Sequence, residues 1–562
     1  MKQINSKWIT VSLIACCFFA QKTDAQINDA NISGSFQLNL QNSQQNTAIG
    51  AQEVKEGILS NAYADIFYNW KNFRAGLRYE YYSPPTLNLD RRFEGQGIAT
   101  RFVNFKKDKF EFTLGNFYDQ YGSGLIFRSY EERSLGYDNA MNGVQVKYNP
   151  TPGVYLKGMV GKQRTFWEYS DGYTRGLDGE FNLNDLNLLA KDCDLNVDLG
   201  ASFVSKYQQS TSTLYNMPLN VGAYSLRAAL QYKKVAADVE FVGKSQDPSA
   251  QNNYVLSKGK GLLINSSYST RGFGASLSLK HVDNMDFRSD REQSGQVLLV
   301  NYNPALTKQN TWALTTFFPY PTVNLGETGL LAEINYKVPK KSLGFLGGTY
   351  LTMSYASSYD INRTVTDSVT IIDAEAGTSI RKASEHTSSF FDRGTYADGE
   401  KKKFFEEFYI EASKKINKKT KGTLGYLYTY YNTDLNAGIS NKDGARDIYA
   451  QVIVAEMKYK IASKKSIRIE AQHLQTKQFE KNWAMFLAEY SHKGYFVAVQ
   501  NLYNYEGKEK LNYPTLSAGF TKGSTQLRAT YGKQRAGLFC VGGVCTNVPA
   551  SDGLTVTLTS NF

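Results

Sequence analysis

The sequence ends with Leu554-Thr555-Val556-Thr557-Leu558-Thr559-Ser560-Asn561-Phe562, in which Leu and Val alternate with Thr. A period of two with one apolar face predicts a β-strand that meets an apolar phase on one side and water on the other. The final residue is aromatic. One such strand cannot bury its apolar face alone, so its meaning depends on how often the pattern recurs.

The same alternation recurs along the whole chain. Between residues 73 and 81 one face carries Phe, Ala, Leu and Tyr, and the other carries Arg74, Arg78 and Glu80. Segments 224–232 and 467–472 alternate in the same way. The apolar faces often end in Tyr, Phe or Trp, as an aromatic girdle at a membrane interface requires. The opposite faces carry charges of both signs, which we expect to point into a wide lumen.

The connections between these segments alternate between short and long. Short turns are predicted near residues 70–72, 106–109, 149–153, 233–235, 338–342, 416–420, 462–465, 492–494 and 522–524. Longer connections are predicted near 41–57, 84–96, 119–141, 246–258, 284–293, 361–402, 434–445 and 539–551. Short periplasmic turns and long extracellular loops are typical of outer-membrane barrels.

The sequence therefore predicts an all-β fold, a single transmembrane antiparallel β-barrel of about 26 strands, within a range of 24–26. The first strand is expected at about Ile32 to Gln41, and both termini are expected on the periplasmic side. We expect no plug domain. Segments 119–141 and 361–402 are the candidates to fold inward.

The N-terminus has the features of a secretory signal peptide. Lys2 and Lys7 precede an apolar run from Trp8 to Ala20, and small residues follow up to Ala25. This pattern predicts a signal peptide over residues 1–25 and a barrel over residues 26–562. A second interpretation stays open, because residues 13–16 also fit a lipobox with Cys16 as the lipid-modified residue.

The composition is typical of a barrel and argues against nucleic-acid binding. Mean hydropathy is −0.43 and aromatics reach 14%, as expected when only every second strand residue meets lipid. The net charge is +12, but the lysines gather in short turns and form no basic patch interleaved with aromatic residues. We therefore expect no nucleic-acid partner.

Cys540 and Cys545 flank a Gly-Gly turn. This spacing predicts a small disulfide across a hairpin in an oxidising compartment. The alternative is a pair of free thiols. The spacing is not a metal signature, because no second Cys or His pair accompanies it.

The densest set of charges lies between Asn116 and Asn139, among several glycines that permit close backbone approach. We interpret this block as a constriction or ligand-binding element in the lumen, or alternatively as a salt-bridged loop that stiffens the wall. The lumen candidates, from this block and from the strand before it, are Arg74, Arg78, Glu80, Arg128, Glu131, Glu132, Arg133 and Asp138.

Catalysis is not expected. The chain has 4 histidines, and the sequence names no Ser or Cys partner for any of them. A partial calcium-loop spacing at Asp192, Asp194 and Asn196 lacks the required Gly and Glu. We predict no enzyme activity, no metal and no cofactor.

The signal peptide, the strand pattern, the block from Asn116 to Asn139 and Phe562 together resemble a family of large outer-membrane barrels of Bacteroidota that has no assigned activity. The resemblance implies a location in the outer membrane. It also implies contact with lipid and recognition of Phe562 by the outer-membrane assembly machinery. The sequence favours a channel for polar solutes with a charged lumen. The alternative is a structural subunit of a larger outer-membrane complex, its lumen closed by loops.

Overall fold

The computed structural model describes residues 30–190, 194–210, 217–295, 297–341, 344–372, 379–436, 446–507 and 509–562. The predicted signal peptide lies outside the described residues. Within them, no helix is long and apolar enough to cross a membrane.

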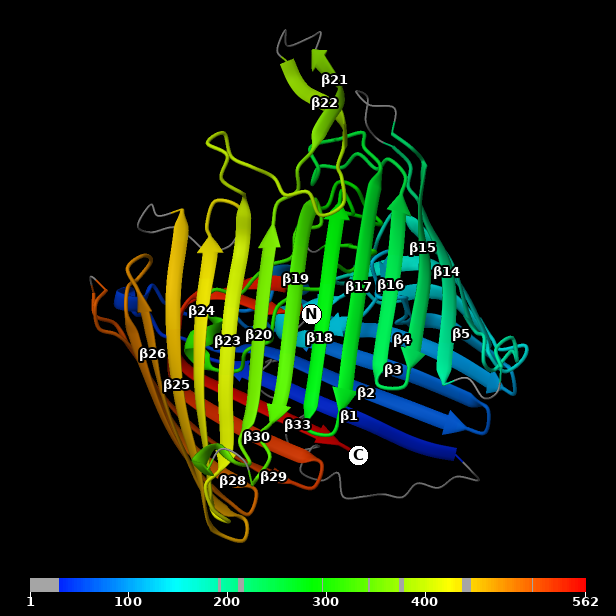
Figure 1. Cartoon of the computed structure of the whole chain (residues 1–562). Coiled ribbons are helices and arrows are strands. Elements are labelled where there is room, and N and C mark those ends of the chain that lie inside the picture. Colours follow the sequence, from blue (N-terminus) through cyan, green and yellow to red (C-terminus); the bar gives the residue numbers. More distant parts are fainter. Residues whose placement is uncertain are drawn as a thin grey trace.

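A closed antiparallel barrel of 24 strands forms the body of the protein (Figure 1). Each strand pairs with the next along the chain. The first and last strands close the ring, with Leu38 opposite Leu558. The wall strands in the first half of the chain are β1 (Ala30–Gln41), β2 (Leu59–Trp70), β3 (Phe73–Tyr82), β4 (Gly95–Lys107), β5 (Phe110–Phe117), β10 (Met141–Tyr148), β11 (Val154–Thr165), β13 (Tyr173–Asn182), β14 (Leu195–Tyr207), β15 (Asn220–Tyr232), β16 (Val235–Lys244), β17 (Gly259–Thr270) and β18 (Phe273–Asp283).

The ring continues with β19 (Gly326–Lys337), β20 (Tyr350–Tyr359), β23 (Lys403–Lys415), β24 (Thr420–Asn432), β25 (Asp447–Ala462), β26 (Lys465–Thr476), β27 (Trp483–His492), β28 (Tyr495–Asn504), β29 (Asn512–Lys522), β30 (Thr525–Gln534) and β33 (Ser551–Asn561). The described helices are short 3-10 turns, η1 (Thr47–Ile49), η2 (Arg91–Phe93), η3 (Arg133–Leu135), η4 (Ala313–Thr316) and η5 (Gly344–Leu346). The prediction of an all-β barrel is confirmed.

The two faces of the wall differ as the alternation predicts. On β3, Phe73 is 45% exposed and Leu77 is 38% exposed, whereas Arg78 is 9% and Glu80 only 1% exposed. The apolar residues therefore lie on the outside of the barrel, and the charged residues lie inside it. A soluble globular protein would bury the first set and hydrate the second, and this wall shows the reverse distribution.

Long connections gather at one end of the barrel, the long-loop end, and short turns gather at the other, the short-turn end (Figure 1). The start of β1 and the end of β33 meet at the short-turn end, where the backbone of Phe562 exchanges two hydrogen bonds with Gly34. The start of β1 and the end of β33 therefore lie at the same end of the barrel, as predicted. The first strand begins at Ala30, two residues before its predicted start.

The barrel has 24 strands, at the lower limit of the predicted range. Among the hairpins that pair only with themselves, β21 (Thr364–Ile372) with β22 (Ser379–Thr387) and β31 (Gly537–Val541) with β32 (Val544–Val548) lie outside the wall, near the connections that the sequence predicts at 361–402 and 539–551.

The hairpin β21–β22 projects beyond the long-loop end (Figure 1). It lies in segment 361–402, which was predicted as a candidate to fold inward. The prediction is wrong for this hairpin. Its two strands bond to each other, so their backbone groups are satisfied without the wall.

The connection after β18 extends to residue 325, much further than the predicted 284–293. It contains Val297 to Val300, an apolar run with the composition of a strand. This run does not join the wall. Val300 is fully buried and exchanges backbone bonds with Phe287 and Arg128, so the run packs against another connection instead.

Candidate functional site in the barrel lumen

The connection between β5 and β10, residues 118–140, folds into the lumen. It forms two very short hairpins, β6 (Gln120–Tyr121) with β7 (Phe127–Arg128), and β8 (Glu131–Glu132) with β9 (Tyr137–Asp138). Its apolar residues Tyr121 and Phe127 are fully buried against inward side chains of the wall. This loop is the segment 119–141 that the sequence marks as a candidate to fold inward.

Gly122 allows the loop to approach the wall closely. Its φ is +53°, and a Cβ at this position would lie 2.6 Å from both the Arg227 side chain and a Glu240 carboxylate oxygen. The backbone N–H of Ser123 donates to the same carboxylate at 2.8 Å. A larger residue at position 122 would therefore separate the loop from the wall.

A network of buried charges joins the loop to β2, β3 and β11. Arg78 contacts Asp65 at 2.5 Å and Glu131 at 2.7 Å, and Arg133 contacts the same two carboxylates at 3.1 and 2.8 Å. Arg164 lies 2.6 Å from both Glu80 and Asp138. Charges withdrawn from water need paired, hydrogen-bonded partners, and here every cation has at least two.

The structure thus brings together five of the predicted lumen residues, Arg78, Glu80, Glu131, Arg133 and Asp138. The other three lie apart from this network. Arg128 stacks on the rings of Tyr130 and Tyr302, 4.4 and 4.1 Å from their centres. Glu132 accepts hydrogen bonds from Ser134 at the start of η3. Arg74 is exposed and lies over Phe67 and Phe102.

Two members of the network, Asp65 and Arg164, were not predicted. The sequence contained a signal for Asp65, because the tight turn after Trp70 sets the register that places Asp65 opposite Arg78. No local pattern marks Arg164. It meets Glu80 only because the loop brings β11 and β3 into one network.

Ionisation in the loop follows from this packing. Burial opposes the charge of Arg133, but the nearby carboxylates of Glu131 and Asp65 raise its pKa above the ordinary value. Burial, followed by the neighbouring rings of Tyr137 and Tyr302, raises the pKa of Tyr130. Arg133 therefore stays charged and Tyr130 stays neutral over the physiological range.

The second inward connection, residues 284–325, packs on the first. The N–H of Tyr302 donates to the carbonyl of Gly124, and the N–H of Arg128 donates to that of Val300, both at 2.9 Å. The Asn139 amide donates to Leu299 at 3.1 Å. The two connections thus form one unit inside the barrel.

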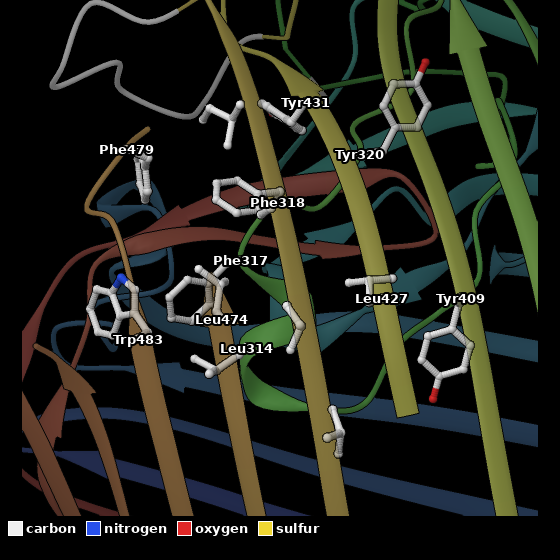
Figure 2. Close-up of a cluster of buried hydrophobic side chains, with 14 of the residues drawn as sticks. Leu314, Phe317, Phe318, Tyr320, Tyr409, Leu427, Tyr431, Leu474, Phe479 and Trp483 are labelled. Atoms are coloured by element: carbon white, nitrogen blue, oxygen red, sulfur yellow. The ribbon is translucent and has the colours of Figure 1, made fainter. Parts of the chain in front are cut away.

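The second connection then crosses to the opposite wall. Residues 312–320 place Leu314, Phe317, Phe318 and Tyr320 in a buried apolar cluster (Figure 2). Their partners come from β23 to β29. The ring of Phe317 meets Trp483 edge to face at 5.1 Å, and the backbone N–H of Leu314 donates to Gln472 at 2.8 Å. Contacts on both walls fix this connection across the lumen.

The hairpin β31–β32 completes the set of inward contacts. Cys540 and Cys545 are joined by a disulfide within it. At its tip, the carbonyl of Gly542 accepts a hydrogen bond from the Tyr302 hydroxyl at 2.8 Å, and that of Gly543 accepts one from the Thr322 N–H at 3.2 Å. The hairpin is therefore attached to the connection 284–325.

A large cavity of about 1600 Å³ remains beside these loops. Its wall is the inward face of β26 to β30, β33 and β1, and it includes residues of the turns at the short-turn end. Most side chains on this wall are polar. The cavity extends to the hairpin β31–β32, where Leu538 lines it.

A second cavity of about 610 Å³ opens among the connections of the long-loop end. Asn88 and Leu538 line both cavities. The hairpin β31–β32 therefore lies where the two cavities adjoin.

One arrangement has the residue types of a serine hydrolase. The Ser257 hydroxyl lies 3.1 Å from Nδ1 of His386, and Nε2 of the same ring lies 3.1 Å from Asp283. However, Ser257 is 0% exposed, lines neither of the two cavities, and accepts a bond from the His386 backbone N–H. A nucleophile must be reachable by its substrate, so this trio holds the base of the hairpin β21–β22.

Among the described residues, no group of three His, Cys, Asp or Glu side chains has the geometry to hold a metal ion. Of the histidines outside that trio, His473 is bonded to the Tyr505 hydroxyl at 2.7 Å. The described part of the lumen thus offers charged and polar surfaces rather than a ligand set for a metal.

These features define a large β-barrel whose lumen is partly filled by its own connections. The chain belongs to a family of unknown function, DUF6029, whose model matches residues 5–562. This agrees with the predicted resemblance to a barrel family without an assigned activity. No curated protein matches the chain.

Several solved barrel structures are similar in outline. The siderophore receptor PirA from Pseudomonas aeruginosa is 9% identical over 95% of this chain and 80% of its own, with a TM-score of 0.39. The P pilus usher PapC translocation pore is 8% identical over 94% of this chain and 99% of its own, with a TM-score of 0.39. The barrel fold of this chain is defined by the strand pairing described above.

Proposed function

We propose that this protein is an outer-membrane channel for polar solutes, with its path along the cavity beside β26 to β30, β33 and β1. The carrying observation is the cavity of about 1600 Å³, most of whose lining residues have polar side chains. It includes residues from the short-turn end and reaches the hairpin at the long-loop end. A polar, hydrated lining suits solutes that must keep their hydrogen bonds to water.

The outward apolar face supports placement in a lipid bilayer. Outer-membrane lipid is the expected surrounding, and the assembly machinery is the expected partner of Phe562. That residue lies at the closure, with its ring where a Cβ of Gly34 would be.

Single-channel conductance of the purified, folded protein in planar bilayers tests the channel. We expect stable current steps that become smaller in Asn39→Trp, because Asn39 lines the cavity and indole would occupy part of the path. The matched control is Asn265→Trp. Asn265 donates to the inward Asp238 but does not line this cavity, so its replacement should leave the steps unchanged.

A structural subunit of an outer-membrane complex is the second candidate, favoured by the bonds that hold loops 118–140 and 284–325 across the lumen. Folded protein that gives no current steps would support this role over the channel. Affinity purification from outer membranes would then identify the partner subunits. We propose no catalytic activity, since the buried Ser257 is closed to substrate.

A further inference from the structure

The charges that line the cavity are mostly positive. Its lining contains 7 Lys and Arg side chains but a single carboxylate, Glu489. This differs from the network around Arg78, where the two signs pair. The cations are Arg133, Lys464, Arg468, Lys493, Arg528, Lys533 and Arg535.

Three of these cations are compensated. Arg133 is paired with Asp65 and Glu131. Arg468 lies between 3.6 and 3.9 Å from three carboxylates on β25, β26 and β27. Arg535 stacks on Phe317 and lies 4.0 Å from Glu480. Their positive charge is largely offset within the protein.

The other four cations, Lys464, Lys493, Arg528 and Lys533, form no ion pair within 4 Å of any described carboxylate, although Lys533 lies opposite Asp552 in the register of β30 and β33. Lys464 and Lys493 lie in adjacent turns at the short-turn end, joined by a backbone bond of 3.0 Å. Arg528 lies on β30 within the barrel, and Lys533 lies near the other end of that strand. Unpaired positive charge therefore extends from Lys464 and Lys493 at the short-turn end to Arg528 inside the barrel.

Arg528 is the best placed of the four to act on a passing ion. Its side chain is exposed to the lumen rather than packed. Its neighbours across the sheet are Gly519 and Thr557, and Asn39 follows next to Thr557. The uncharged ring of Phe496 covers Gly519 on one side, and neutral polar groups lie on the other. Nothing at this level of the wall cancels the guanidinium charge.

We infer that the path is selective for small anions, inorganic anions and carboxylates, and that Arg528 is the main residue of this preference. Cationic rings and rows in pores raise the local concentration of anions and repel cations. The planar guanidinium also matches carboxylate and phosphate oxygens in two-point contact. This inference rests on the proposed channel.

The test is the reversal potential of single channels in a potassium chloride gradient, which gives the permeability ratio of chloride to potassium. We expect chloride to permeate better in the unaltered protein. Arg528→Gln should lower the ratio, and Arg528→Glu should lower it further, until potassium is preferred. Two variants are used so that a folding failure of one does not decide the result.

Arg74→Glu is the matched control. Arg74 is also an inward, exposed arginine without an ion pair among the described residues, but it does not line the cavity. Its replacement should leave the ratio unchanged, and equal effects from positions 74 and 528 would overturn the inferred path. Current steps that prefer potassium in the unaltered protein would overturn the anion preference but keep the channel. A folded protein without current steps would overturn the channel itself.

Discussion

Two sides of the barrel accommodate their lumen-facing charged side chains in different ways. On the filled side, β2 to β18, inward charges such as Arg78, Glu80 and Arg164 are buried, and the side chain of Arg164 is only 3% exposed, whereas Arg74 stays exposed. On the open side, β26 to β30 with β33 and β1, the inward groups line a cavity of about 1600 Å³, and Arg528 is exposed. Both sides have the same alternation of apolar and polar residues.

The length of the connections accounts for the difference. The filled side receives residues 118–140 and the first part of connection 284–325, which turn back into the lumen and bury apolar residues there, while residues 312–320 continue to β23–β29. On the open side, connection 477–482 joins neighbouring strands directly, and the longer connection 535–550 forms the hairpin β31–β32 between the two cavities. The buried Arg164 and the exposed Arg528 therefore differ in the connections that cover them, not in the alternation of the strands that carry them.

The largest effect is expected when the inward loop 118–140 is removed from the filled side. Phe117 and Met141 are paired across β5 and β10, so a short Gly-Ser turn can replace residues 118–140 without moving the strands. We expect a larger single-channel conductance, because the charges of Arg78 and Arg164 become hydrated lumen charges. Replacing 364–387 by a similar turn is the control. That hairpin lies outside the barrel (Figure 1), and a conductance increase from it would contradict the comparison.

A single residue can test the pairing on the filled side. Arg164→Met leaves Glu80 and Asp138 without their shared cation, and breaking a buried ion pair in this way costs about 3–5 kcal/mol. Arg74→Met removes only stacking on Phe67 and Phe102, worth about 0.5–1 kcal/mol at an exposed site. Urea unfolding in detergent micelles, followed by tryptophan fluorescence, measures both. Similar losses of unfolding free energy in the two variants would show that the buried Arg164 stabilises the protein no more than the exposed Arg74.

The boundary between the two sides depends on the hairpin β31–β32. Replacing Cys540 and Cys545 together by Ser removes a small covalent loop, which should destabilise the hairpin by about 2 kcal/mol. Hydrogen exchange of residues 537–548 should become faster, while exchange in β14 to β16 stays the same. Uniform acceleration in both regions would indicate a global effect and contradict a local role.

A smaller effect is expected at the contact of this hairpin with the second connection. Tyr302→Phe removes the hydroxyl that donates to Gly542, worth about 1 kcal/mol. It keeps the ring on which Arg128 stacks. Exchange at the hairpin tip should rise slightly, and Tyr130→Phe, which keeps the Gly542 contact, serves as the control. Equal changes in both variants would show that this bond does not hold the tip.

Much of the wall could be predicted from the sequence. The alternation at residues 73–81 assigned the two faces of β3 correctly, and the short turn after Trp70 contained enough information to place Asp65 opposite Arg78. The candidate residues Arg78, Glu80, Glu131, Arg133 and Asp138 do lie together. Arg128 and Glu132 were drawn into the same prediction by proximity in the chain, but their side chains have other partners.

The sequence alone predicts the barrel, with its alternating faces, its short-turn and long-loop ends and the pairing of its first and last strands. These follow from a period of two, which is local and is repeated by every strand. Only the tertiary structure decided that residues 284–325 cross the lumen, that Arg164 joins the network, that β21–β22 projects outward and that one side stays open. Those outcomes depend on contacts between residues that are distant in the chain, such as Glu80 with Arg164, Arg128 with Val300 and Leu314 with Gln472, and no local period encodes them.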